Sequence, residues 1–134
     1  MSRRVDRTLV VDDVEPLGAQ PGEVVAQGDW YEYEAKYSDG GMELVAPAPI
    51  SAEQAARLEE LALAAFRLGG CSGLARCDFF VEPDGEVLVN EVNTMPGFTP
   101  TSMFPRMWAA SGVDYSDLVD TLLRAALARP VGLR

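Results

Sequence analysis

Apolar residues recur at helical spacing over residues 51–68, and this is the clearest periodic pattern in the chain. Ser51 and Gln54 have the spacing of a capping box, and Gly69 and Gly70 follow as a stop signal. The pattern therefore predicts a helix that packs one apolar stripe on a sheet. The predicted stripe consists of Ala55, Leu58, Leu61, Ala62, Ala65, Phe66 and Leu68.

Three further segments have the composition of strands. Valine and leucine dominate residues 5–11, just before the turn-like pair Asp12-Asp13. Residues 74–82 and 87–93 form two more predicted strands, joined by the hairpin signal Pro83-Asp84-Gly85-Glu86. Because almost nothing precedes the first strand, we expect it to leave an unpaired sheet edge, a sign of a partial domain.

The segment from Glu15 to Gly41 is rich in glycine, proline and aromatic residues, which predicts turns, short strands and a long ordered loop. Within it, Trp30 to Tyr37 places a lysine between tyrosines. Alternating tyrosine and glutamate also fits a half-buried strand edge, so the pattern alone leaves both interpretations open.

After the hairpin, the pattern predicts a loop from Thr94 to Pro100 and a short helix over residues 103–110. A last amphipathic helix is expected to start at a cap, Asp114 or Ser116, and to end near residue 129. Its predicted inward face consists of Leu118, Val119, Leu122, Leu123 and Ala126. These elements together predict an α+β fold with a mainly antiparallel sheet and flanking helices.

The register of the hairpin decides which side chains meet, since a one-residue slip turns every side chain to the other face. A three-residue loop, 83–85, sets Asp78 opposite Asn90, and turn statistics favour it. A four-residue loop, 83–86, sets Asp78 opposite Glu91. We choose the longer loop because it places oxygen ligands together.

In that register Asp78, Glu91 and Asn93 share one face, a donor set suited to Mg²⁺. Two apposed carboxylates repel each other unless a metal ion or Arg76 compensates. Taken alone, Glu-x-Asn on a strand also fits a solvated strand face. The Pro96-Gly97 loop that follows favours a site, because a glycine lets backbone N–H groups approach developing negative charge.

Composition narrows the function further. The chain has 134 residues, a size that fits one domain, and a formal charge of −10 with 21 acidic and 11 basic side chains. Such a balance disfavours nucleic acid as a partner. No apolar run approaches a membrane span or a secretory signal, so we expect a cytoplasmic protein without a membrane partner. Cys71 and Cys77 lie in no zinc-binding pattern and are expected to be reduced thiols.

Several motifs in order resemble the D-alanine:D-alanine ligases of the ATP-grasp superfamily. The resemblance rests on Gly73-Leu74-Ala75-Arg76-Cys77-Asp78-Phe79-Phe80, Asn90-Glu91-Val92-Asn93-Thr94-Met95-Pro96-Gly97-Phe98-Thr99, Ser102-Met103 and Tyr33-Glu34-Ala35-Lys36-Tyr37. It implies ATP-dependent joining of two D-alanines through an acyl phosphate, for peptidoglycan precursors in cell wall biogenesis. It also implies Mg²⁺ or Mn²⁺ as cofactor.

The resemblance implies a role for each matching residue. Asp78, Glu91 and Asn93 would bind magnesium, with Glu91 contacting two ions. The implied oxyanion site is Arg76 with the Gly97 amide, and the implied contacts to the second D-alanine are Ser102 and Met103. The implied contacts to ATP are Lys36, Asn90 and Glu91, and Tyr37 would help to close the loop over the site.

The resemblance covers only the C-terminal part of such a ligase. It implies a partial ATP-grasp domain over residues 1–129 with a tail, 130–134, without the N-terminal and central domains. Arg4 stands where relatives commonly have an acidic residue. We therefore expect an incomplete or split half that needs an N-terminal ligase half or a homodimer partner. The alternatives are a binding module, for Mg²⁺, nucleotide phosphate or ligase docking, and a purely structural domain.

Overall fold

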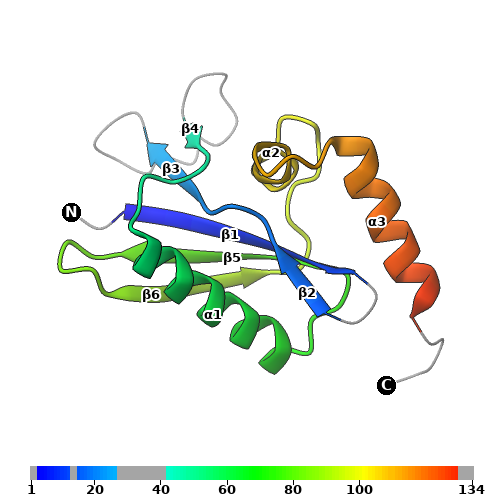
Figure 1. Ribbon diagram of the computed structural model, residues 1–134, viewed down its shortest axis with the longest axis horizontal. Coiled ribbons are helices and arrows are strands. Elements are labelled where there is room, and N and C mark those ends of the chain that lie inside the picture. Colours follow the sequence, from blue (N-terminus) through cyan, green and yellow to red (C-terminus); the bar gives the residue numbers. More distant parts are fainter. Residues whose placement is uncertain (1–2, 13–14, 27–41, 130–134) are drawn as a thin grey trace.

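The computed structural model describes residues 3–12, 15–26 and 42–129. The predicted segment Trp30 to Tyr37 and the predicted tail lie outside these residues. The chain forms an antiparallel sheet with the strand order β4-β3-β1-β5-β6, to which β2 adds by pairing with β1 (Figure 1). The elements are β1 (Arg3–Asp12), β2 (Glu15–Gly18), β3 (Gly22–Ala26), β4 (Met42–Val45), α1 (Ala52–Leu68), β5 (Leu74–Val81), β6 (Val87–Asn93), α2 (Met103–Ala110) and α3 (Tyr115–Ala128). The predicted α+β fold is confirmed.

Strand β1 lies inside the sheet, which corrects the expected exposed edge. Arg4 pairs with Val24 of β3 on one side and with Phe80 of β5 on the other. The chain after β1 folds back as β2 and β3, and β5 later fills the opposite side. Segments that follow β1 therefore supply both of its neighbours, and within the described residues β1 leaves no unpaired edge that would indicate a partial domain.

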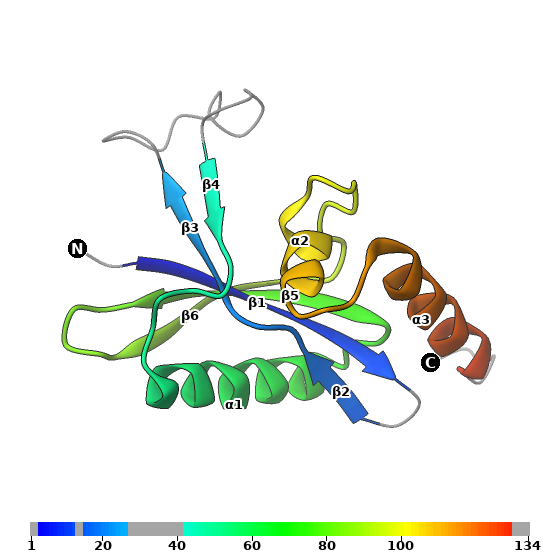
Figure 2. The same ribbon diagram turned by 45° about the horizontal axis from the view of Figure 1, so that its top comes forward.

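Helix α1 covers one face of the sheet, and α2 lies on the other side (Figure 2). Leu58, Ala62 and Phe66 of α1 pack against Cys77 and Phe79 of β5 in one buried core. The predicted stripe is therefore correct at its centre but wrong at its end, where Leu68 is 89% exposed. Leu68 is the last residue of the helix and falls outside the i, i+4 row that starts at Leu58.

The capping box predicted at the start of α1 is present. The Ser51 Oγ accepts the backbone N–H of Gln54 at 3.1 Å, and the Gln54 side chain accepts the N–H of Ser51 at 3.0 Å. We expect Ser51→Ala to lower the free energy of unfolding by about 1 kcal/mol, because one N-terminal N–H of the helix loses its partner. Urea unfolding measures this, with the exposed Ser72→Ala as control. Equal losses in the two variants would contradict the capping role.

The β5–β6 hairpin combines the two predicted registers. At the turn, Glu82 N–H bonds to the Glu86 carbonyl and Gly85 takes a φ of +95°, so the loop is the three-residue one, 83–85. The predicted four-residue loop is wrong. A β-bulge between Asp78 and Phe79 then shifts the pairing by one residue, which still places Asp78 opposite Glu91.

The C-terminal helices form a second core. Phe104 and Met107 of α2 and Leu118 of α3 are buried, with Ala19 beside them. Helix α3 begins at the Asp114 cap, whose carboxylate accepts the N–H of Asp117 at 2.9 Å. The predicted inward face is wrong for two residues, since Leu123 is 59% exposed and Ala126 is exposed as well.

Both cysteines are free thiols, as expected. Cys77 is buried in the core under α1, and this burial raises the pKa of its thiol to about 11, with Cys71 and Asp78 adding to the effect. Within the described part of the chain, none of the helices is long and apolar enough to cross a bilayer.

Candidate active site

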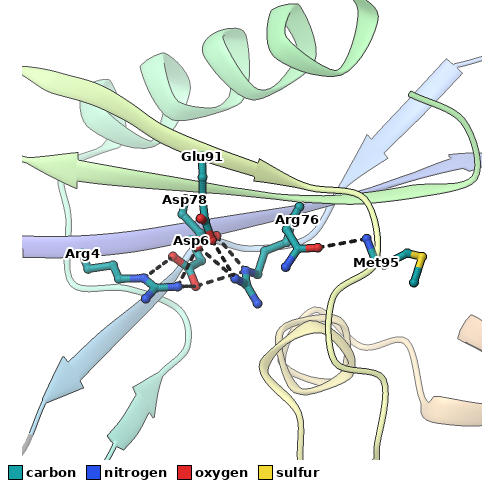
Figure 3. Close-up of polar contacts among 7 residues, drawn as sticks. Arg4, Asp6, Arg76, Asp78, Glu91 and Met95 are labelled. Carbon is teal, nitrogen blue, oxygen red and sulfur yellow. Dashed lines mark hydrogen bonds and ion pairs between the residues drawn. The ribbon is translucent and has the colours of Figure 1, made fainter. Parts of the chain in front are cut away.

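Five charged side chains gather on the face of the sheet opposite α1, and we call them the charged cluster. They come from β1, β5 and β6 and consist of Arg4, Asp6, Arg76, Asp78 and Glu91 (Figure 3). Side chains alternate along a strand, so Val5, Cys77 and Phe79 enter the core under α1 while their neighbours point the other way. In register, Asp6 lies opposite Asp78 and Asp78 opposite Glu91. Three carboxylates therefore form a row across three strands.

Two guanidinium groups hold this row together. Arg76 binds Asp78 with two hydrogen bonds, Nε to Oδ1 at 2.7 Å and a terminal nitrogen to Oδ2 at 2.9 Å. Arg4 also reaches Asp78 Oδ2 at 2.7 Å, and its Nε contacts Asp6 Oδ1 at 3.1 Å. A terminal nitrogen of Arg76 lies 3.5 Å from Glu91. Arginine suits this role because its planar fork matches a carboxylate.

The cluster is buried at its centre and open at one end. Asp6 and Asp78 have no exposed side-chain surface, Arg4 and Arg76 are 15% and 12% exposed, and Glu91 is 55% exposed. Three acidic and two basic groups leave a formal charge of −1. Burial raises the pKa of Asp6 to about 6, and the adjacent Asp78 carboxylate adds to this rise, while Arg4 and Arg76 oppose it.

The raised pKa of Asp6 predicts a specific dependence of stability on pH. The protonated Asp6 carboxyl contributes its full stabilisation below about pH 4. This contribution is lost as the pH rises through about 6, because the folded state then holds an unfavourable buried charge. Measured without metal, in EDTA, wild type should lose up to about 3 kcal/mol relative to Asp6→Asn between pH 4 and 7. Urea unfolding across this range measures the difference. A difference that stays constant or grows with pH would contradict the assignment.

The predicted metal ligands lie next to one another on this face. Glu91 pairs with Asp78 and Asn93 with Arg76 in register, and Asn93 Oδ1 accepts the N–H of Met95 at 2.9 Å. Among the described residues, His, Cys, Asp and Glu alone form no group of three that could hold a metal. A cation here would therefore also need the amide oxygen of Asn93. Two carboxylates and an amide oxygen are hard donors that fit Mg²⁺ or Mn²⁺.

The loop after β6 contains the other predicted site residues. Gly97 and Ser102 lie side by side, since a Cβ at Gly97 would come 3.1 Å from Ser102 Oγ. Ser102 is the N-cap residue of α2, but its hydroxyl makes no capping bond and accepts the N–H of Thr99 at 3.0 Å. The Tyr115 hydroxyl donates to the Phe98 carbonyl at 2.7 Å, which anchors the loop to α3. Met103, the first residue of α2, is half-buried.

One predicted site residue of the described chain, Asn90, belongs to neither of these groups. It is the extra residue of the β6 bulge and is exposed, and the register set by the turn ends at Val89, directly before it. Lys36 and Tyr37 lie outside the described residues.

The comparison with protein families decides the family of this chain. Residues 7–124 match the family model described as the D-ala D-ala ligase C-terminus. The chain belongs to the D-Ala–D-Ala ligase family. Curated relatives agree, since the chain is 53% identical over 121 residues to a D-alanine–D-alanine ligase from Streptomyces griseus and 51% identical over 120 residues to one from Geobacillus thermodenitrificans.

Solved structures of ligases share the fold of this member of the D-Ala–D-Ala ligase family. The D-alanine–D-alanine ligase from Coxiella burnetii superimposes with a TM-score of 0.79 at 33% identity, covering 95% of this chain and 32% of that one. The VanG D-Ala:D-Ser ligase from Enterococcus faecalis gives 0.80 at 33% identity, covering 93% and 36%. The two curated relatives are covered over 31% and 33% of their length, and this chain over 89% and 90%. The chain thus spans about a third of the ligases it matches.

Sequence reasoning missed two members of the charged cluster, Arg4 and Asp6. Both lie before residue 7, where the match to the ligase family begins. A signal was nevertheless present, because Arg4-x-Asp6 and Arg76-x-Asp78 repeat the same arginine and aspartate spacing. On antiparallel neighbouring strands, this spacing places all four side chains on one face whenever the two aspartates are in register.

Proposed function

We propose that this chain forms the C-terminal catalytic part of an ATP-dependent D-alanine:D-alanine ligase, which joins two D-alanines through an acyl phosphate. The observation that carries the proposal is the charged cluster on β1, β5 and β6, which continues directly into the loop that holds Gly97 and Ser102. Cations and N–H donors at such a site would stabilise charge that develops during phosphoryl and acyl transfer. The 53% identity to a D-alanine–D-alanine ligase supports the same reaction.

Asp78, Glu91 and Asn93 would hold Mg²⁺ or Mn²⁺ in this proposal. The ion would offset the charge of the ATP phosphates when bound. Glu91 supports the role because its carboxylate is more than half exposed and projects from the open end of the cluster. Asn90 would lie near ATP on the same strand.

The protein's own donors would handle the acyl group. Arg76, held by Asp78 in a fixed orientation, would donate to the oxyanion together with the Gly97 N–H. The Ser102 hydroxyl and the Met103 N–H would bind the carboxylate of the second D-alanine. The bond from the Thr99 N–H to Ser102 Oγ supports this, because it leaves the hydroxyl hydrogen free to turn toward a ligand or the Thr99 hydroxyl. Lys36 and Tyr37 would act from the segment outside the described residues.

D-Alanine is our proposed second substrate. A structural neighbour is a D-Ala:D-Ser ligase, so the shared fold is compatible with more than one second substrate. The choice of D-alanine rests on the 53% and 51% identity to curated D-alanine–D-alanine ligases. The product would serve peptidoglycan precursor synthesis in the cytoplasm.

The remaining contacts to ATP and the first D-alanine would come from ligase segments that correspond to the other two thirds of the relatives. We expect the 134-residue chain alone to be a poor catalyst. The rate acceleration that comes from holding both reactants in the correct orientation needs both halves of the site. We propose that a separate N-terminal ligase half or a homodimer partner supplies these contacts.

The test is ADP release from ATP with D-alanine and Mg²⁺. The 134-residue chain is assayed alone and after mixing with the separately expressed N-terminal two thirds of the Streptomyces griseus relative. We expect ADP release with D-alanyl-D-alanine formation only in the mixture, and its loss with Glu91→Gln. A folded chain that associates with the N-terminal part but yields no ADP would refute the catalytic proposal and favour the non-catalytic binding module.

A further inference from the structure

We propose that Arg4 competes with a divalent cation for the carboxylate of Asp78, so that this chain binds the metal more weakly than its other ligands would allow. The inference rests on the proposed metal role of Asp78, Glu91 and Asn93. It goes beyond that role because it assigns to Arg4 the control of metal occupancy.

The first argument is that the oxygens of Asp78 are engaged. Oδ2 accepts from Arg4 at 2.7 Å and from Arg76 at 2.9 Å, while Oδ1 accepts from Arg76 at 2.7 Å. A magnesium ion needs a carboxylate oxygen at about 2.0–2.1 Å, with its remaining ligands close around it. Oδ2 already accepts two hydrogen bonds, so a cation that binds this buried oxygen must displace one of the two arginines from it (Figure 3).

Of the two arginines, Arg4 makes fewer of the described hydrogen bonds to Asp78 and is therefore the one we expect to be displaced from it. Arg76 lies on the same strand as Asp78, binds it through two nitrogens and also approaches Glu91. Arg4 comes from β1 and makes one of the described bonds to Asp78, while it contacts both oxygens of Asp6 at 3.1 and 3.3 Å. Arg4 therefore still has Asp6 as a partner after it releases Asp78.

Charge gives a second and independent argument. The three carboxylates and Arg76 alone carry a formal charge of −2, which one divalent cation would balance. Arg4 reduces this charge to −1, so the bound cation would leave the cluster positive. In a largely buried site, an excess positive charge within a few ångströms of the cation is strongly unfavourable. Removing the Arg4 guanidinium should therefore strengthen cation binding.

Titration of the 134-residue chain with Mn²⁺ tests this, with the EPR signal of free Mn²⁺ as the readout. We expect Arg4→Gln to lower the Kd for Mn²⁺ at least about tenfold, since a unit charge a few ångströms away is removed. Arg3→Gln is the matched control, because Arg3 is the adjacent arginine of β1, bonds to Glu23 at 2.6 Å instead and loses the same charge. The control should lower the Kd about twofold or less.

Binding that is no tighter in Arg4→Gln than in Arg3→Gln overturns the competition. If Arg4→Gln does not fold, the double variant Arg4→Gln/Asp6→Asn replaces it, since it removes one charge of each sign from the cluster. This variant should also bind Mn²⁺ more tightly than wild type, and equal or weaker binding overturns the inference. Adding Glu91→Gln to the tighter variant should abolish the gain, which locates the ion at the cluster.

The result also separates this inference from the proposed function. Mn²⁺ binding that requires Glu91 but ignores Arg4 refutes the competition and leaves the metal ligands standing. The absence of Mn²⁺ binding in wild type and in every folded variant, at millimolar Mn²⁺, refutes the proposed metal ligands themselves.

Discussion

Replacing Asp78 by alanine is expected to lower the free energy of unfolding by about 3–5 kcal/mol, enough to unfold a marginally stable domain. Asp78 has no exposed side-chain surface, and its two oxygens accept three hydrogen bonds from Arg4 and Arg76. Without Asp78, the nearest described carboxylates to the two little-exposed guanidinium groups are Asp6 and the more distant Glu91. Each guanidinium then loses charge-assisted hydrogen bonds in a place where little solvent can replace them, and this loss is costly.

The control for this prediction is Asp120→Ala. Asp120 also pairs with an arginine, Arg124 at 2.6 Å, but both side chains are well exposed on α3. Water and salt screen such a pair, so its loss should change stability little. Urea unfolding at pH 7 in EDTA compares the two variants. If Asp78→Ala were as stable as Asp120→Ala, the charged cluster would not hold the three strands together.

The second large effect concerns activity and not stability. Glu91→Gln should reduce ADP release in the mixture with the N-terminal ligase part by about a hundredfold or more, because the proposed ion would lose a charged ligand worth several kcal/mol. The side chain is 55% exposed and its described contact to Arg76 is 3.5 Å long. The substitution should therefore leave the unfolding transition almost unchanged.

The matched control is Glu86→Gln, which removes the same charge from an exposed position in the turn of the same hairpin. It should keep the activity of the wild-type mixture. Steady-state ADP release as a function of Mg²⁺ separates the two variants. A Glu91→Gln chain that equals the control at every Mg²⁺ concentration would remove Glu91 from the proposed site.

Local sequence signals predicted the elements well where they act on a few neighbouring residues. Ser51 with Gln54 marked the start of α1, and Asp114, one of the two predicted caps, begins α3, because caps involve residues three positions apart. The turn of the hairpin followed its statistics as well. Leu68 is exposed because it falls outside the i, i+4 row of α1, which the predicted stripe overlooked, whereas the exposure of Leu123 depends on which neighbours α3 packs against, and periodicity does not contain this.

The site needed information between distant segments. The pairing of Asp78 with Glu91 arises from a bulge after a three-residue loop, so the choice of register was right at the site and its stated cause was wrong. Bulges have no strong signal in a single sequence. The position of β1 between β3 and β5 brings Asp6 opposite Asp78, over seventy positions later in the chain, and the repeated Arg-x-Asp spacing hints at a shared face but does not fix this pairing. Lys36 and Tyr37 remain predictions.

The ligase role of this chain can be tested by exchanging the matching third of an active enzyme. Residues 3–129 of this chain replace the corresponding segment of the Streptomyces griseus D-alanine–D-alanine ligase, and D-alanyl-D-alanine formation is measured with ATP, Mg²⁺ and D-alanine. We expect a chimaera with activity within about tenfold of its parent, or about 1.4 kcal/mol in activation free energy, whose activity disappears with Glu91→Gln. A folded chimaera that binds ATP but forms no dipeptide would contradict the claim that this site supports ligase chemistry.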